Sequence, residues 1–112
     1  MRALVAGNLR RFGMKVIEAR NGDELYAVMR RMAAHRRRPD VVLSDVHMPG
    51  HDALEAIAEL QALHPGVPMV MMTASGNGST RARAAELGAT AVLDKPLDLV
   101  ALRRMITDLS TH

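Results

Sequence analysis

Three residues of this sequence could together handle a phosphoryl group. Asp45, Thr73 and Lys95 each follow a short apolar stretch. A carboxylate can attack a phosphoryl donor to form an acyl phosphate, a hydroxyl can donate a hydrogen bond to the phosphoryl oxygens, and an ammonium supplies a compact positive charge. Each residue also has an ordinary alternative role, because aspartate caps turns, threonine is common in strands and lysine often ends a strand in solvent. The phosphoryl site therefore depends on the three residues meeting in space.

The elements expected around these residues alternate between strands and helices. An amphipathic helix over residues 2–12 is followed by four strand-helix pairs. The predicted strands are 14–19, 41–44, 67–72 and 90–93, and the predicted helices that follow them are 23–35, 53–63, one from the 75–79 loop to Gly88, and 99–109. This alternation, without hairpin turns, predicts a parallel sheet with helices on both faces. Sites in such folds lie beyond the carboxyl ends of the strands, where Asp45, Thr73 and Lys95 are expected to converge.

Composition limits the class of protein. A length of 112 residues with 48% hydrophobic content predicts one domain over residues 1–112. The absence of cysteine excludes disulfides and thiolate metal sites. The longest apolar stretch, residues 67–72, is far shorter than the roughly 20 residues that cross a bilayer, and the sequence starts without a signal peptide. We therefore expect a cytoplasmic protein with no membrane partner.

The net charge of +3 rests on 13 arginines and two lysines, and five of the arginines lie in residues 30–38. Such a cluster could contact nucleic acid or an acidic partner. Phe12 and Tyr26 are the only aromatic residues, so the sequence offers no platform on which bases could stack. A solvated helix end is the favoured interpretation, and nucleic acid is not an expected partner of this domain.

Three other motifs suggest a function only weakly. His47 and His51 have the spacing of helical metal ligands, but Pro49-Gly50 between them prevents a continuous helix. The glycine-containing stretch 76–80 lacks the third glycine of a dinucleotide fingerprint, because Arg81 stands there, and is interpreted as a strand-to-helix loop. The nine methionines could form an adaptable binding surface, but those in the 67–72 strand are expected in the core.

Three segments of the chain resemble the signature segments of response-regulator receiver domains of two-component signalling. They are Asp45-Val-His-Met-Pro-Gly50, Met72-Thr-Ala74 and Asp94-Lys-Pro96, and residues 13–22, 39–43 and 86–89 agree as well, so that the resemblance covers essentially the whole chain. It implies a flavodoxin-like, CheY-like α/β fold and a signalling module in a phosphorelay rather than an enzyme. A sensor histidine kinase or a phosphotransfer protein would then be its partner.

The resemblance also assigns roles to individual residues. Asp45 resembles the phosphoacceptor, Thr73 the hydroxyl that follows the phosphoryl group on activation, and Lys95 the lysine that pairs with it. The backbone carbonyl of His47 resembles a Mg²⁺ ligand beside Asp45.

Two features depart from the family: Val92 stands where an aromatic switch residue is usual, and the sequence begins in the first helix, without the first strand and its pair of acidic residues. Because the first strand is missing, we expect four strands rather than five. Because Mg²⁺ prefers several oxygen ligands and the acidic pair is missing, we also expect a weakened Mg²⁺ site.

The first strand of the family lies between the strands predicted here at 14–19 and 41–44. About five buried apolar residues, at roughly 1.5 to 3 kcal/mol each, would rival the roughly 5 to 15 kcal/mol that stabilise a small domain. An empty slot is therefore not expected: either the remaining strands pair directly, or a second copy fills the gap as a homodimer or strand-exchanged oligomer. Three functional hypotheses follow, namely a phosphoacceptor receiver, a degenerate receiver acting as a phosphorylation-independent dimerisation or interaction module, and a truncated form of a longer parent.

Overall fold

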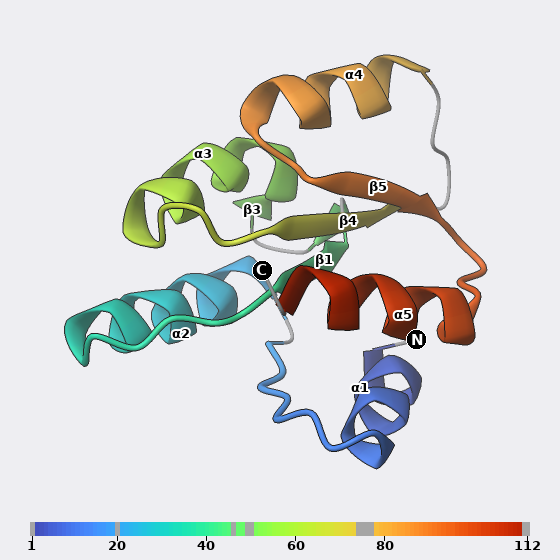
Figure 1. Cartoon of the computed structure of the whole chain (residues 1–112). Helices are drawn as coiled ribbons and strands as arrows, with labels where there is room; N and C mark the ends of the chain where they lie inside the picture. The colour runs from blue at the N-terminus through green and yellow to red at the C-terminus, as the bar shows by residue number, and fades with distance from the viewer. Residues whose placement is uncertain (1, 20, 46, 49–50, 74–77, 111–112) are drawn as a thin grey trace.

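The computed structural model describes residues 2–19, 21–45, 47–48, 51–73 and 78–110, and Figure 1 shows their arrangement. Helices and short strands alternate along most of the chain. In order they are α1 (Arg2–Arg11), α2 (Gly22–Ala34), β1 (Val42–Asp45), β2 (His47–Met48), β3 (His51–Asp52), α3 (Ala53–Leu63), β4 (Met69–Thr73), α4 (Gly78–Leu87), β5 (Ala91–Asp94) and α5 (Leu99–Ser110). None of the helices in these ranges combines the length and the apolar character needed to span a bilayer.

The main sheet within the described ranges has three parallel strands in the order β1-β4-β5. The central strand, β4, reads Met-Val-Met-Met-Thr and is buried along its whole length. Such a run fits a strand that is covered on both faces, because in a parallel sheet neither face meets water. A separate antiparallel pair, β2 with β3, flanks residues 49–50.

Helices cover both faces of the sheet, and two groups of apolar side chains hold them there (Figure 1). The first group, here called the α2-α3-α4 core, joins those helices to β1 and β4 and includes Met29, Ile57, Leu60 and Met71. The second, the α1-α5 cluster, is built on Val5, Leu9, Leu102 and Ile106. The predicted α/β class, a parallel sheet between two helical layers, is confirmed.

Local signals set the ends of several helices. Asn21 caps α2, because its Oδ1 accepts a hydrogen bond from the backbone N–H of Glu24 at 2.9 Å. Asp98 does the same for α5 through the N–H groups of Val100 and Ala101. Gly88 follows α4 with φ +110°, a conformation that residues with a Cβ rarely adopt. The predicted helices therefore begin and end within a few residues of their expected positions.

Two expectations were wrong. Residues 14–19 form no strand, although their β-branched residues predicted one. A strand needs a hydrogen-bonding neighbour, and within the described ranges the only strand bonded to β1 is β4. The carbonyl of Val16 is instead bonded by the guanidinium of Arg10, at 2.9 Å. The main sheet consequently has three strands rather than the four expected. The antiparallel pair of β2 and β3 was not predicted either.

Candidate functional site

The candidate site lies where the three parallel strands end. Asp45 is the last residue of β1, Thr73 is the last residue of β4, and Lys95 directly follows β5. The register places Asp45 beside Met72 and Thr73 beside Asp94. The backbone N–H of Lys95 donates to the carbonyl of Thr73 at 2.9 Å, so the ladder continues to the edge of the site.

The side chains of Asp45 and Lys95 meet directly. The Lys95 ammonium donates to Oδ2 of Asp45, across a separation of 50 residues in the chain. Their side chains are 27% and 24% exposed, so the ion pair is partly shielded but open to a small solute. Thr73 is fully buried and stands at the end of the strand between them. The Asp45 carboxylate and the Lys95 ammonium therefore form a partly exposed ion pair, and the buried Thr73 ends the strand between them.

Arg81 of α4 lies next to the strand end that carries Lys95. The sequence analysis did not predict a role for Arg81 at this site. Its Nη1 donates to the carbonyl of Val92 at 2.8 Å, and its Nη2 pairs with Asp94, the residue before Lys95. Arg81 thus joins α4 to β5 at two points. The only available signal was an arginine in the first turn of a helix after the site loop, which by itself indicates no partner. Val92, at the position where the family usually carries an aromatic residue, packs partly buried against the α2-α3-α4 core.

The residues predicted to hold Mg²⁺ are Asp45 and the backbone carbonyl of His47. Such an ion takes near-octahedral oxygen ligands, usually with carboxylates among them. Asp45 is the only carboxylate predicted as a ligand, and its Oδ2 already accepts from Lys95. His47 lies in β2, and residue 46, which links it to Asp45, falls outside the described residues. Within the described ranges no three His, Cys, Asp or Glu residues group as metal ligands.

The remaining sequence candidates lie apart from this site. His47 and His51 stand on opposite strands of the β2-β3 pair and not on a helix. The five arginines of residues 30–38 occupy the exposed end of α2 and the loop after it, where Arg30 lies over the Tyr26 ring. Met69, Met71 and Met72 are buried, which confirms them as core residues. Of the 76–80 loop, residues 76–77 lie outside the described residues, and α4 already begins at Gly78.

Comparison with known proteins identifies the family. Residues 1–107 match the response regulator receiver domain family, and the chain belongs to it. The transcriptional regulatory protein GlrR of Escherichia coli K12 is 33% identical over 96 residues, which are 86% of this chain and 20% of that protein. A protein-glutamate methylesterase/protein-glutamine glutaminase of Hahella chejuensis is 44% identical over 88 residues, 75% of this chain and 24% of that protein. The chain thus spans about a fifth of the length of these curated relatives.

The fold agrees with this assignment. The receiver domain of NtrX from Brucella abortus is 28% identical, with a TM-score of 0.82, and the match covers 96% of this chain and 88% of that one. The flavodoxin-like, CheY-like fold that the sequence motifs implied is therefore confirmed. Receiver domains are signalling modules of two-component systems, and this chain is one of them.

Proposed function

We propose that this chain, as a single domain over residues 1–112, is a phosphorelay receiver in which Asp45 accepts the phosphoryl group. One observation carries the proposal: the ammonium of Lys95 bonds the carboxylate of Asp45 at the ends of β1 and β5. Lysine at that position neutralises the carboxylate before reaction and can neutralise a phosphoryl group afterwards. Thr73, at the end of the intervening strand, supplies a hydroxyl on the same border of the sheet.

The reaction at this site is a phosphoryl transfer between two oxygen atoms or from nitrogen to oxygen. A carboxylate oxygen of Asp45 attacks the phosphorus atom of the donor, and the bond from phosphorus to the donor's leaving group breaks with its electron pair passing to that group. The product is a mixed anhydride on Asp45. The Lys95 ammonium then moves from the carboxylate oxygen to a phosphoryl oxygen, and the Thr73 hydroxyl donates a second hydrogen bond. Both side chains thereby stabilise the charge of the phosphoryl oxygens, which is present at this site only after transfer.

A sensor histidine kinase or a phosphotransfer protein is the proposed donor. The relatives named above support a regulatory setting, because two-component receivers work as modules within longer regulators. Mg²⁺ has at most a weakened site here, since Asp45 and the carbonyl of His47 are the only ligands proposed for it.

The test is intact-mass spectrometry after incubation with acetyl phosphate, over a titration of Mg²⁺. We expect the wild-type chain to gain the mass of one phosphoryl group, with a yield that rises without saturating at ordinary Mg²⁺ concentrations. Asp45→Asn should gain none. Asp40→Asn is the matched control, because Asp40 is an exposed carboxylate five residues before Asp45, and it should behave as the wild type. An adduct on Asp45→Asn would contradict the assignment.

A second function is favoured by a different observation. Within the described ranges β1 has a strand neighbour on one side only, and the site offers no group of metal ligands. A degenerate receiver that works as a phosphorylation-independent dimerisation or interaction module needs a surface and no phosphoryl transfer. Absence of adduct at high Mg²⁺, in a chain that still self-associates, would select this function over the first.

A further inference from the structure

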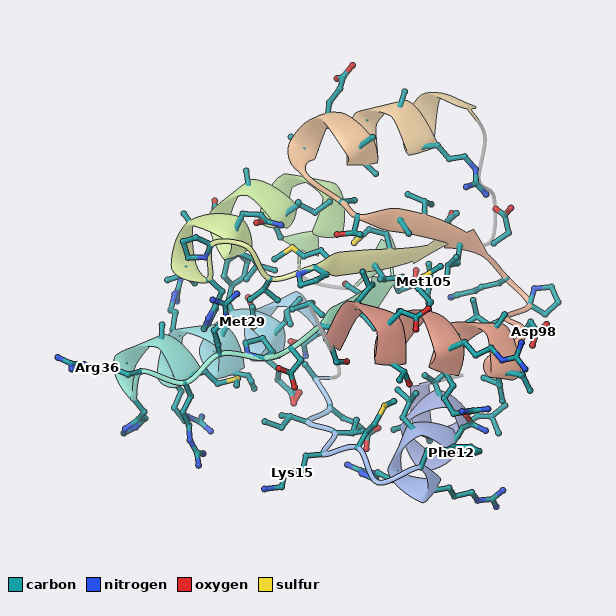
Figure 2. All side chains as sticks on the ribbon, in the orientation of Figure 1. Phe12, Lys15, Met29, Arg36, Asp98 and Met105 are labelled. Atoms are coloured by element: carbon teal, nitrogen blue, oxygen red, sulfur yellow. The ribbon has the colours of Figure 1, made fainter. Side chains whose placement is uncertain are left out.

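The arginines at the end of α2 take no part in the site described above. They are here called the arginine surface, all of them are exposed, and they are Arg30, Arg31, Arg36, Arg37 and Arg38. Figure 2 shows Arg36 projecting from the far end of α2. The loop that follows α2 leads to the first residue of β1, whereas Asp45 is the last residue of that strand. The arginine surface therefore lies at the amino end of the sheet, away from the candidate site.

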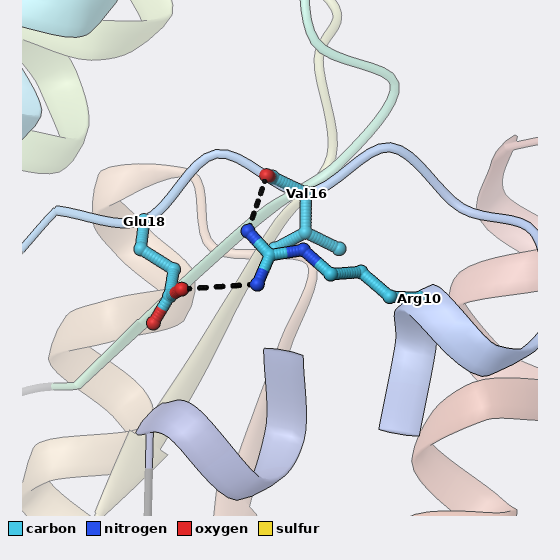
Figure 3. Close-up of polar contacts among 3 residues, drawn as sticks. All are labelled: Arg10, Val16 and Glu18. Atoms are coloured by element: carbon cyan, nitrogen blue, oxygen red, sulfur yellow. Dashed lines mark hydrogen bonds and ion pairs between the residues drawn. The ribbon is translucent and has the colours of Figure 1, made fainter. Parts of the chain in front are cut away.

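The charge of the arginine surface has no counterpart among the residues that the structure describes. Arginines elsewhere show the contrast: Arg10 is paired with Glu18 at 3.2 Å (Figure 3), and Arg81 is paired with Asp94. Within the same described ranges no ion pair joins a carboxylate to the arginine surface. Like charges that lie close together repel one another, so a partner with several negative charges would stabilise this end of the molecule.

The backbone of Arg36 gives a second, independent observation. Its φ is +55°, in the left-handed region that favours glycine. The N–H groups of Arg36 and Arg37 donate to the carbonyls of Ala33 and Met32, at 3.1 and 2.7 Å, which is the pattern of a helix C-terminal cap. Three other helices, α1, α3 and α4, are followed by a glycine with positive φ, namely Gly13, Gly66 and Gly88. After α2 an arginine occupies this strained position and adds its charge to the cluster.

We propose that the arginine surface binds the phosphate backbone of duplex DNA, without regard to base sequence. This function goes beyond phosphoryl transfer and does not depend on it. Guanidinium groups bind phosphate oxygens through paired N–H donors, and binding releases counterions that are condensed on the duplex. The lack of aromatic residues argues against single strands, whose bases stack on such side chains, but contact with the backbone of a duplex needs no stacking.

Two other polyanions fit this surface less well. Firm binding to an anionic membrane usually needs apolar side chains that enter the lipid. The exposed large apolar residues of the described ranges lie elsewhere, on α1, on the segment after it and on α5: Leu4, Phe12, Ile17 and Val100. An acidic peptide is flexible, and exposed ion pairs contribute too little to offset the cost of ordering it. Duplex DNA is stiff and presents its phosphates already in place.

Fluorescence anisotropy with a labelled duplex of about 25 base pairs, over a series of salt concentrations, tests the proposal. Arg30 lies over an aromatic ring and Arg38 donates to a backbone carbonyl, so we expect Arg31, Arg36 and Arg37 to contact phosphates. At about −0.9 for each phosphate, the logarithm of the binding constant should fall with the logarithm of the salt concentration with a slope of about −2.7. A second duplex of unrelated sequence should bind equally.

Two matched substitutions separate a local surface from the total charge. Arg31 of α2 and Arg83 of α4 are both exposed helical arginines. We expect Arg31→Gln to weaken binding about fourfold and to reduce the salt slope by about 0.9, whereas Arg83→Gln should stay within about 1.5-fold of the wild type. Both substitutions remove one positive charge, so equal losses would overturn the assignment to the arginine surface.

Arg36 provides a test in which binding and stability should change in opposite directions. Arg36→Gly removes a charge and relieves the left-handed backbone, so we expect binding to weaken about fourfold while the urea midpoint of unfolding rises. Arg36→Lys keeps the charge and should bind within about twofold of the wild type. Weaker binding in a more stable variant cannot come from loss of the fold. A wild-type affinity for the duplex in Arg36→Gly would contradict the proposal.

Competitors decide between duplex DNA and the other polyanions. We expect polyglutamate, and vesicles of phosphatidylcholine with phosphatidylglycerol, to displace the labelled duplex only at much higher concentrations of negative charge than unlabelled duplex. Displacement by either at an equal concentration of charge would overturn the choice of DNA. A chain that binds no duplex at low salt would overturn the proposal as a whole. The acetyl phosphate assay on Arg31→Gln should give the wild-type yield, so a failure of phosphoryl acceptance and a failure of DNA binding can be told apart.

Discussion

The two faces of this receiver are held together by different means. On the α2-α3-α4 side, helices pack on strands that are themselves bonded to one another, and side chains such as Ile57 and Met71 are almost completely buried. On the α1-α5 side, the N-terminal residues 2–19 contribute no strand and are attached by side chains, through the α1-α5 cluster and Arg10.

The candidate site belongs to the part of the molecule that is held by strand pairing. Asp45 and Thr73 end strands of the bonded sheet and Lys95 follows one, so the ladder places all three residues at the same border. We therefore expect changes in the α1-α5 cluster to disturb the strand ends less than changes in the α2-α3-α4 core do.

Truncation of equivalent leucines on the two faces should have unequal costs. Leu60 of α3 is 3% exposed in the α2-α3-α4 core, and Leu9 of α1 is 7% exposed in the α1-α5 cluster. We expect Leu60→Ala to lower the free energy of unfolding by about 4 kcal/mol and Leu9→Ala by about 2 kcal/mol, because the second site has less rigid surroundings and can collapse around the lost atoms. Urea unfolding of both variants measures this. Equal costs would mean that the two faces are equally rigid.

Loss of the buried histidine contact should be the next largest effect. His64, 4% exposed at the end of α3, bonds through Nε2 to the carbonyl of Met29 in α2, at 2.8 Å. His64→Leu leaves that carbonyl without its partner, and we expect a cost of about 2 kcal/mol in urea unfolding. The yield of the phosphoryl adduct should be unchanged, since the contact is remote from the strand ends. A lost adduct in a folded variant would contradict the independence of the site from the helix layer.

Removal of the lysine should affect the site more than the fold. Lys95→Met deprives Asp45 of its ammonium partner, but the pair is about a quarter exposed, so we expect unfolding to become easier by only about 1 kcal/mol. Adduct formation should fall strongly, because the phosphoryl oxygens lose their counter-charge. A double-mutant cycle with Asp45→Asn, followed by urea unfolding, isolates the pair. Strict additivity would show that the two side chains do not interact in solution.

The smallest effect is expected at Arg10. Its bonds to Val16 and Glu18 are exposed, so Arg10→Ala should change the free energy of unfolding by about 0.5 kcal/mol. Exchange of the amides of residues 15–19 should nevertheless become faster. Unchanged exchange would show that Arg10 does not hold this segment.

Much of the fold could be predicted because its signals are local. The buried run that became β4, the alternation of strand and helix, and the stop at Gly88 all lie within short stretches of sequence. Residues 14–19 show the limit of such signals. Their β-branched residues favour a strand, but a strand forms only with a neighbour, and neighbours are decided by the whole sheet.

The candidate site was predictable to a similar degree. The strand ends that carry Asp45, Thr73 and Lys95 could be found from apolar runs and the three motifs, and their roles remain predictions. The direct bond between Lys95 and Asp45 could not be found in this way, because it joins residues 50 positions apart. The link from Arg81 to Asp94 and Val92 was unpredictable for the same reason, since it depends on how α4 packs on β5.

The most direct test of the central claim, that three strand ends form one anion site, is a ¹⁵N NMR titration with beryllofluoride, an analogue of the phosphoryl group, in the presence of Mg²⁺. The account predicts that the backbone amide resonances of Asp45, Thr73 and Lys95 shift with one common binding curve. The amide resonance of Asp40 should not shift, and Asp45→Asn should abolish all of the shifts. Shifts confined to a single strand end, or shifts that persist in Asp45→Asn, would contradict it.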